Sequence, residues 1–147
     1  YYPGMALYDT DYWTWTQKQA EALRRRSGNE LDWELLAQEL DLLGRSEERE
    51  LKSRFVILLA HLLKWMFQPE RRSRSWRNTI DSQRDEIAEH FARNPGLKGL
   101  EPEIFESAYR QARRDASSET DMDVGVFPEE APFTPDQTKD PNWMPAD

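Results

Sequence analysis

The sequence contains no cysteine. This absence excludes disulfide bonds, thiolate chemistry and metal sites built from cysteine. Phosphate-binding glycine loops, nucleophile elbows and zinc-protease patterns are also lacking, so the sequence carries no common nucleotide-binding or hydrolytic signature. Only two histidines, His61 and His90, are present among the 147 residues. Imidazole chemistry is therefore confined to these two positions.

No hydrophobic run is long enough to cross a bilayer, which takes about 20 apolar residues. The longest run extends from Phe55 to Phe67 and is interrupted only by His61 and Lys64. A surface helix would show an apolar stripe and a polar face, whereas this segment is apolar nearly all round. We therefore expect it to be the buried central helix of an all-helical domain.

The chain has fewer basic than acidic residues, 20 against 28, which gives a net charge of −8. Residues 1–100 carry 16 acidic and 16 basic side chains, whereas residues 101–147 carry 12 acidic and 4 basic ones. A net acidic chain is a poor general binder of nucleic acid or of anionic membranes, so we predict neither as a general partner. The N-terminus shows no basic start followed by an apolar run, as a signal peptide would. A cytoplasmic location is expected.

At 147 residues the chain is expected to form a single domain, over residues 5–147. Met5 is a candidate native start, which would make residues 1–4 a leader of unknown origin. Periodicity and capping signals predict about five helices. They run from Thr10 or Asp11 to about 26, from 32 to 43, from 46 to about 67, from Ser73 or Ser75 to about 93, and from 102 to about 118–121. Gly44 is predicted to end the second helix with a positive φ.

Residues 124–147 differ from the rest of the chain. Five prolines exclude a long helix there: Pro128, Pro132, Pro135, Pro141 and Pro145. Apolar side chains recur between them and are expected to anchor the segment, with one short turn near residues 134–136. The predicted fold is thus an all-α, compact bundle of about five helices around a buried central helix. An extended, proline-rich C-terminal tail packs on its outside.

Four arginines stand together between the third and fourth expected helices: Arg71, Arg72, Arg74 and Arg77. A helix N-terminus offers free N–H groups and a partial positive charge. Arginines beside it suit phosphate or carboxylate. The pattern predicts a ligand-binding site for an anionic ligand or a protein partner. The alternative is that these arginines pair internally, with the 32–43 helix or with Glu129 and Glu130, and the sequence leaves both open.

Arg54 and His61 are seven residues apart and therefore lie nearly on one helical face. An arginine followed by four to six residues and a histidine resembles the motif of the all-helical HEPN ribonucleases, in which a dimer pairs two such motifs to cut RNA. Arg84 and His90 fit the same spacing. The resemblance implies Arg54 and His61 as candidate catalytic residues. The other interpretation of His61 is a satisfied core residue.

Glu86 and His90 stand four residues apart on the fourth expected helix and could supply two metal ligands. Di-iron bundles take a Glu-x-x-His pair from each of two helices, and the sequence contains no such pair. We therefore predict no metal site and no cofactor.

Several blocks, in the right order, resemble the bacterial family named domain of unknown function 29. They are LDWELLAQEL (31–40), LGRSE (43–47), LLAHLLKW (58–65), QPERRSRSW (68–76) and FPEEAPFT (127–134). The likeness covers about residues 7–143. It implies a small, compact, all-helical bacterial protein whose tail belongs to the domain, and it assigns no catalytic residue.

Together these patterns predict a non-enzymatic interaction module that binds a protein partner or an anionic ligand near Arg71–Arg77. The alternative is an RNA-directed binder or ribonuclease that uses Arg54 and His61.

Overall fold

The structure is a computed structural model that describes residues 3–146, with side chains from Leu7 onward. Within these residues the chain forms six α-helices and no β-strand. They are α1 (Pro3–Thr10), α2 (Tyr12–Arg25), α3 (Trp33–Phe67), α4 (Arg74–Arg93), α5 (Glu101–Thr120) and α6 (Pro135–Lys139). The all-α prediction is confirmed. Residues 1 and 2 of the expected leader and Asp147 of the tail lie outside the described residues.

Backbone contacts divide the chain into two compact units that adjoin in sequence between Ser46 and Glu47. The N-terminal unit contains α1, α2 and the start of α3. The C-terminal unit contains the remainder of α3 together with α4, α5 and α6. The expectation of a single domain over residues 5–147 stays a prediction.

The stretch around Gly44 is continuous helix, so the prediction that two helices meet there was wrong. Residues 33–67 form one helix of 35 residues, and no glycine in the described part of the chain has a positive φ. A glycine inside a helix costs only about 1 kcal/mol relative to alanine. Because propagation adds a hydrogen bond at each further residue, the good helix formers on both sides of Gly44 carry the helix through it.

The N-terminal unit is arranged around α2. As the sequence predicts, Asp11 caps this helix by accepting a hydrogen bond from the N–H of Thr14 at 3.1 Å. The side chain of Trp15 is buried, and its indole N–H donates to a carboxylate oxygen of Asp32 at 2.7 Å. This bond fixes α2 against the segment that leads into α3. The preceding helix, α1, was not among the expected helices.

Two further hydrogen bonds within the N-terminal unit join two tyrosines to α3. The hydroxyls of Tyr8 and Tyr12 both donate to the carboxylate of Glu39. The hydrogen bond to Glu39 raises the pKa of Tyr8 to about 12 and likewise raises that of Tyr12. The two hydroxyls in turn lower the pKa of the Glu39 carboxyl.

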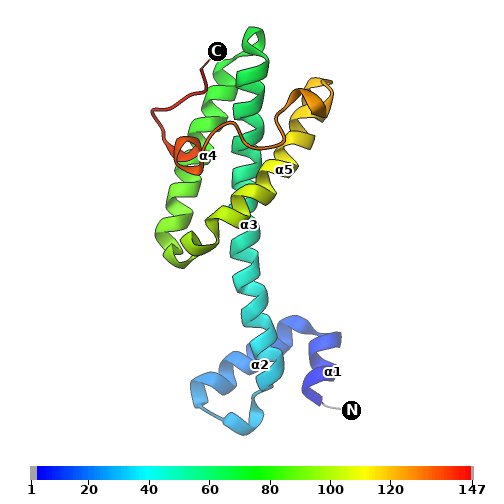
Figure 1. Cartoon of the computed structure of the whole chain (residues 1–147). Coiled ribbons are helices and arrows are strands. Elements are labelled where there is room, and N and C mark those ends of the chain that lie inside the picture. The colour runs from blue at the N-terminus through cyan, green and yellow to red at the C-terminus, as the bar shows by residue number, and fades with distance from the viewer. Residues whose placement is uncertain (1–2, 147) are drawn as a thin grey trace. The chain divides into compact units, whose positions relative to one another are not determined.

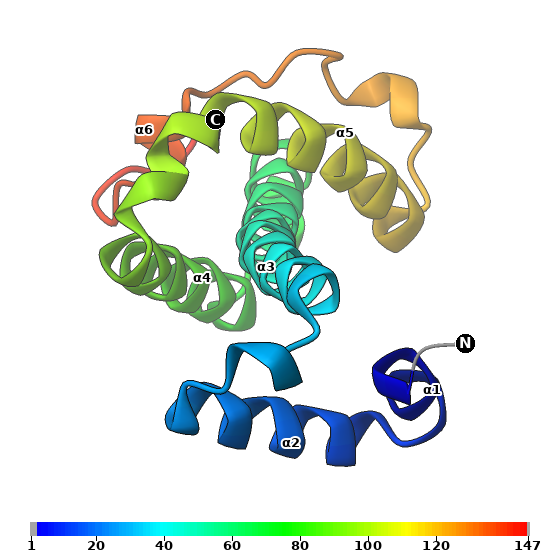
Figure 2. The ribbon, with the colours of Figure 1, turned by 90° about the horizontal axis from the view of Figure 1, so that it is seen from below.

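The centre of the C-terminal unit is the second half of α3, as predicted. Figure 2 shows α4 and α5 on two different sides of it. Phe55 is fully buried, and its ring meets that of Phe105 of α5 edge-on at 5.8 Å between centroids. A face of α5 formed by small residues is also buried, at Ala108, Ala112 and Ala116. Alanines at this face allow close packing of the helix against the core.

The C-terminal tail crosses the outside of this bundle (Figure 1). Phe127 and Phe133 are buried in the same core as the helices, with 1% and 4% of their surfaces exposed. The Tyr109 hydroxyl of α5 donates to the carbonyl of Pro128 at 2.6 Å. The short turn expected near residues 134–136 is α6, which Thr134 caps. The prediction of a tail packed on the helices is confirmed.

A buried arginine also binds the tail. Arg84 of α4 is only 3% exposed, and its Nε donates to the carbonyl of Thr138 at 2.8 Å. A second contact runs from its Nη2 to the carbonyl of Gln137 at 3.5 Å. Since a buried charge is costly unless it is hydrogen-bonded, these two carbonyls of α6 are part of what holds Arg84 in the core.

Candidate anion-binding site

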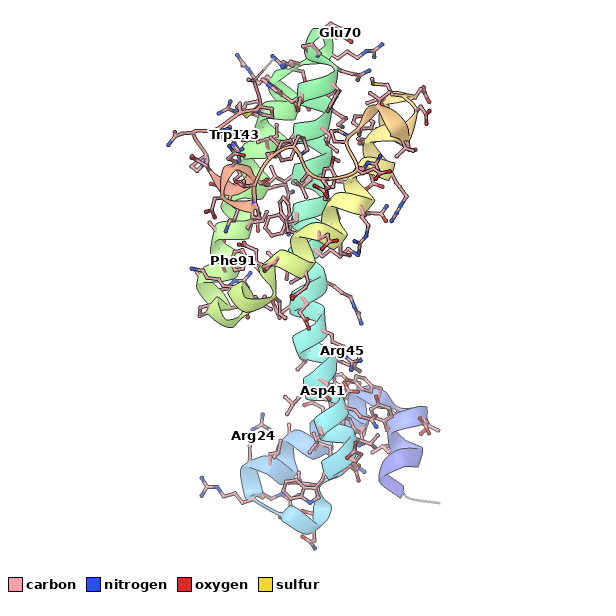
Figure 3. The ribbon with its side chains drawn as sticks, viewed as in Figure 1. Arg24, Asp41, Arg45, Glu70, Phe91 and Trp143 are labelled. Carbon is pink, nitrogen blue, oxygen red and sulfur yellow. The ribbon has the colours of Figure 1, made fainter. Side chains whose placement is uncertain are left out.

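The four clustered arginines lie where the chain turns from α3 into α4. Pro69 opens a 3-10 turn, Pro69–Arg71, directly after α3, and Figure 3 shows Glu70 at this tip of the C-terminal unit. Ser73 then caps α4 by accepting a hydrogen bond from the N–H of Trp76 at 3.1 Å. One of the two predicted caps of this helix is thereby confirmed, and the arginines flank a true helix N-terminus.

Two of the four arginines are bound to the protein itself. The Nε of Arg72 donates to the carbonyl of Trp65 at 2.8 Å, and its guanidinium lies over the Trp65 ring at 5.1 Å from the centroid. Arg77 pairs with Asp81, one turn further along α4, at 3.3 Å. Arg72 therefore holds the turn against the end of α3. Arg77 pairs within α4, with a residue that is not among the internal partners predicted from the sequence.

The other two arginines, Arg71 and Arg74, are exposed. Among the described residues, neither makes an ion pair or a hydrogen bond through its side chain. The chain has eight more acidic than basic residues, so acidic partners are not scarce. Two exposed arginines thus stand beside the N-terminus of α4.

A shallow groove of about 530 Å³ runs along α4 from Arg74. Its remaining lining is polar and uncharged: Ser75, Asn78, Thr79, Ser82 and Gln83. Gln83 is 9% exposed, and its buried side-chain oxygen has no hydrogen-bond partner within the described part of the chain. The groove therefore combines positive charge at one end with hydrogen-bonding groups along its length.

Lys64 adds no free charge to this site. It is 7% exposed, pairs with Glu119 of α5 at 3.1 Å and lies over the Trp76 ring at 5.2 Å. The sequence shows this residue only as a polar interruption of an apolar run. Its role in joining α3, α4 and α5 could not be found from the sequence, because its partners are distant in the chain.

The structure directs Arg54 and His61 toward different neighbours. Arg54 lies between two carboxylates, 3.8 Å from Glu50 and 3.9 Å from Glu86 of α4. His61 is half-buried, and its Nδ1 lies 2.8 Å from the carbonyl of Ile57. Burial lowers the pKa of His61 from its ordinary value. No described contact joins this arginine to this histidine, and their catalytic role stays a prediction.

The second pair with the same spacing has structural partners. Arg84 binds the tail as described above, and His90 is 1% exposed with its Nε2 2.9 Å from the carbonyl of Glu47. Glu86, considered above as a metal ligand together with His90, contacts Arg54 instead.

Comparison with known proteins identifies one family. A search of curated proteins and a search of solved structures each gave no significant match. None of the described helices combines the length and apolar character needed to cross a membrane. A family model described as "Domain of unknown function DUF29" matches residues 7–144. Since this match covers nearly the whole chain, the protein belongs to the DUF29 family.

Proposed function

We propose that this protein is a non-enzymatic interaction module that binds a protein partner or an anionic ligand at the turn between α3 and α4. The observation that carries the proposal is that two of the four arginines are bound within the protein and the other two are not. Arg72 and Arg77 are held by Trp65 and Asp81. Arg71 and Arg74 are exposed, without a side-chain partner in residues 3–146.

The chemistry of the site suits a carboxylate or a phosphate. A guanidinium group can bind either anion through two parallel hydrogen bonds. The first N–H groups of α4 and its dipole add to this attraction. The groove beside Arg74 offers hydroxyl and amide groups to a partner with hydrogen-bonding groups of its own, as an acidic peptide segment has.

The test is a pull-down from a bacterial lysate with the tagged chain, at low and at moderate salt, with both protein and nucleic acid identified. The informative variant reverses both exposed charges, Arg71→Glu with Arg74→Glu. The matched control reverses two exposed cations, Arg93→Glu at the C-terminal end of α4 and Lys98→Glu in the 3-10 segment after it. This control changes the net charge by the same amount. Circular dichroism checks that both variants keep their helices.

We expect the wild type and the control to capture the same protein or anion, and the Arg71/Arg74 variant to lose it. Capture that is equal in all three proteins would refute the proposal, as would capture of nothing. Arg72 is left unchanged, since its hydrogen bond to Trp65 is part of the fold. A bacterial cell and a cytoplasmic location remain predictions.

The alternative function, an RNA-directed binder or ribonuclease using Arg54 and His61, is tested by the nucleic-acid fraction of the same experiment. Binding through phosphates weakens steeply between low and moderate salt. RNA that is recovered by the wild type and by the Arg71/Arg74 variant, and lost with His61→Ala, would favour this alternative.

A further inference from the structure

The surroundings of His90 hold a group of ligand atoms that the proposed function does not use. His90 lies in the last turn of α4 and is 1% exposed. Its Nε2 is 2.9 Å from the backbone carbonyl of Glu47. Because a carbonyl oxygen can only accept, Nε2 carries the proton of this hydrogen bond. In the neutral ring, the lone pair is then on Nδ1.

Nδ1 faces a carboxylate. It lies 3.7 Å from an oxygen of Glu50, and it has no hydrogen-bond partner among the described residues. A lone pair on nitrogen and a carboxylate oxygen repel each other across such a gap. A cation between them would turn this repulsion into two favourable contacts, and burial strengthens the effect because the local dielectric constant is low.

A third ligand atom comes from Glu47. One carboxylate oxygen of Glu47 lies 3.4 Å from Nε2, the ring nitrogen of His90 that donates to the Glu47 carbonyl, so this carboxylate has to rotate to reach an ion on Nδ1. Glu47 and Glu50 are three residues apart on α3, so their side chains lie on the same face of the helix. One ligand atom from each of Glu47, Glu50 and His90 can be chosen so that all three lie within 4.8 Å of one another.

The separation between Nδ1 of His90 and the Glu50 carboxylate is close to that in a metal site. Nitrogen and oxygen ligands bind Zn²⁺ at about 2.0–2.2 Å in tetrahedral geometry, which puts two ligand atoms about 3.4 Å apart. The distance of 3.7 Å between His90 and Glu50 exceeds this by a few tenths of an ångström. The side chains of Glu47 and Glu50 are 43% and 42% exposed, so both carboxylates can rotate toward an ion and solvent can deliver it.

We propose that Glu47, Glu50 and His90 bind a divalent transition-metal ion of the zinc class. Imidazole together with carboxylates suits Zn²⁺ and its neighbours in the series better than Mg²⁺ or Ca²⁺, which prefer oxygen ligands alone. The hydrogen bond from Nε2 to the Glu47 carbonyl is the outer contact that metal-bound histidines commonly make, and it fixes the ring. Three protein ligands leave at least one coordination position for water or a substrate.

Arg54 limits the strength of the site without blocking it. Its guanidinium contacts the other oxygen of Glu50 at 3.8 Å, whereas the oxygen that faces His90 is a different one. The amide of Asn94 donates to Glu47 at 3.4 Å, which orients that carboxylate. A proton on Nδ1 is the competing occupant, because an imidazolium would also pair with Glu50.

The test is calorimetric titration of the full, tag-free chain with ZnCl₂ near neutral pH, after treatment with a chelator and its removal. The variants are Glu47→Gln and Glu50→Gln, which keep size and remove the charged ligand. The control is Glu48→Gln, in the same turn of α3 and also half-buried, because its carboxylate is not part of the group. Nitrogen NMR of the His90 ring, with and without Zn²⁺, reports which nitrogen binds.

We expect one Zn²⁺ per chain for the wild type and for Glu48→Gln, with a change in the Nδ1 signal of His90. Glu47→Gln and Glu50→Gln should each weaken binding by at least about tenfold, the low end of losses seen when even an outer contact is removed. The proposal is overturned if the wild type binds no stoichiometric Zn²⁺, if Glu50→Gln binds as tightly as the wild type, or if Nδ1 is protonated and unaffected by Zn²⁺.

Discussion

Replacing Phe127 by alanine should destabilise the C-terminal unit strongly. Phe127 is 1% exposed, and its ring meets that of Phe67 edge-on at 5.4 Å between centroids. An aromatic side chain buries about 150–250 Å², which at about 25 cal/mol per Å² corresponds to about 4–6 kcal/mol. Alanine retains part of this burial, so we expect Phe127→Ala to lower the free energy of unfolding by about 3–5 kcal/mol.

Val126 supplies a matched control, because it precedes Phe127 in the chain and is 42% exposed. Val126→Ala should change stability by no more than about 0.5 kcal/mol. The assay is urea unfolding followed by circular dichroism. With a slope of about 1–3 kcal/mol per molar urea, Phe127→Ala should lower the midpoint by at least about 1 M. Equal midpoints for the two variants would refute the conclusion that the tail is part of the core.

Two further predictions concern α3. Gly44→Ala should raise the free energy of unfolding by about 1 kcal/mol, because Gly44 is helical and an added Cβ meets no atom within 4 Å. The measurement is a thermal melt. A lower melting temperature for the variant would instead support a positive φ at this position. Stability should fall as the pH drops below about 6.5, the ordinary pKa of histidine, because burial lowers the pKa of His61 in the folded state and the unfolded chain then binds more protons. In urea titrations across this range His61→Gln should show a shallower fall, and an unchanged pH dependence would contradict the assignment to His61.

The local signals of the sequence were sufficient for most of the helix ends. Asp11, Ser73 and Thr134 cap their helices through contacts with residues three positions away, and such short-range contacts can be read from a sequence. The prediction at Gly44 was wrong because the cost of one glycine is small beside the cooperativity of a long helix. Each local signal can be recognised in the sequence, but the net free energy of continuing or ending the helix depends on all of them together.

The candidate sites depend on contacts that no short-range pattern contains. The density of arginines at residues 71–77 is visible in the sequence, but the hydrogen bond that turns Arg72 back to Trp65 is not. Likewise, His90 is 43 residues away from Glu47, and the sequence offers Glu86 as its nearer companion. Packing of α4 against α3 brings His90 close to the carboxylates of Glu47 and Glu50. These contacts are visible only in the folded structure.

The bond between Arg84 and the tail imposes an order of events on a chain made from its N-terminus. Arg84 and its acceptor at Thr138 are 54 residues apart. At about 5–20 residues per second, roughly 3 to 11 seconds pass between the synthesis of the donor and that of its acceptor. During this interval the guanidinium must stay hydrated, so the surface of α4 that later receives the tail remains open to water. Final packing of the C-terminal unit is therefore a late step of biosynthesis, completed only when residues 127–138 have emerged.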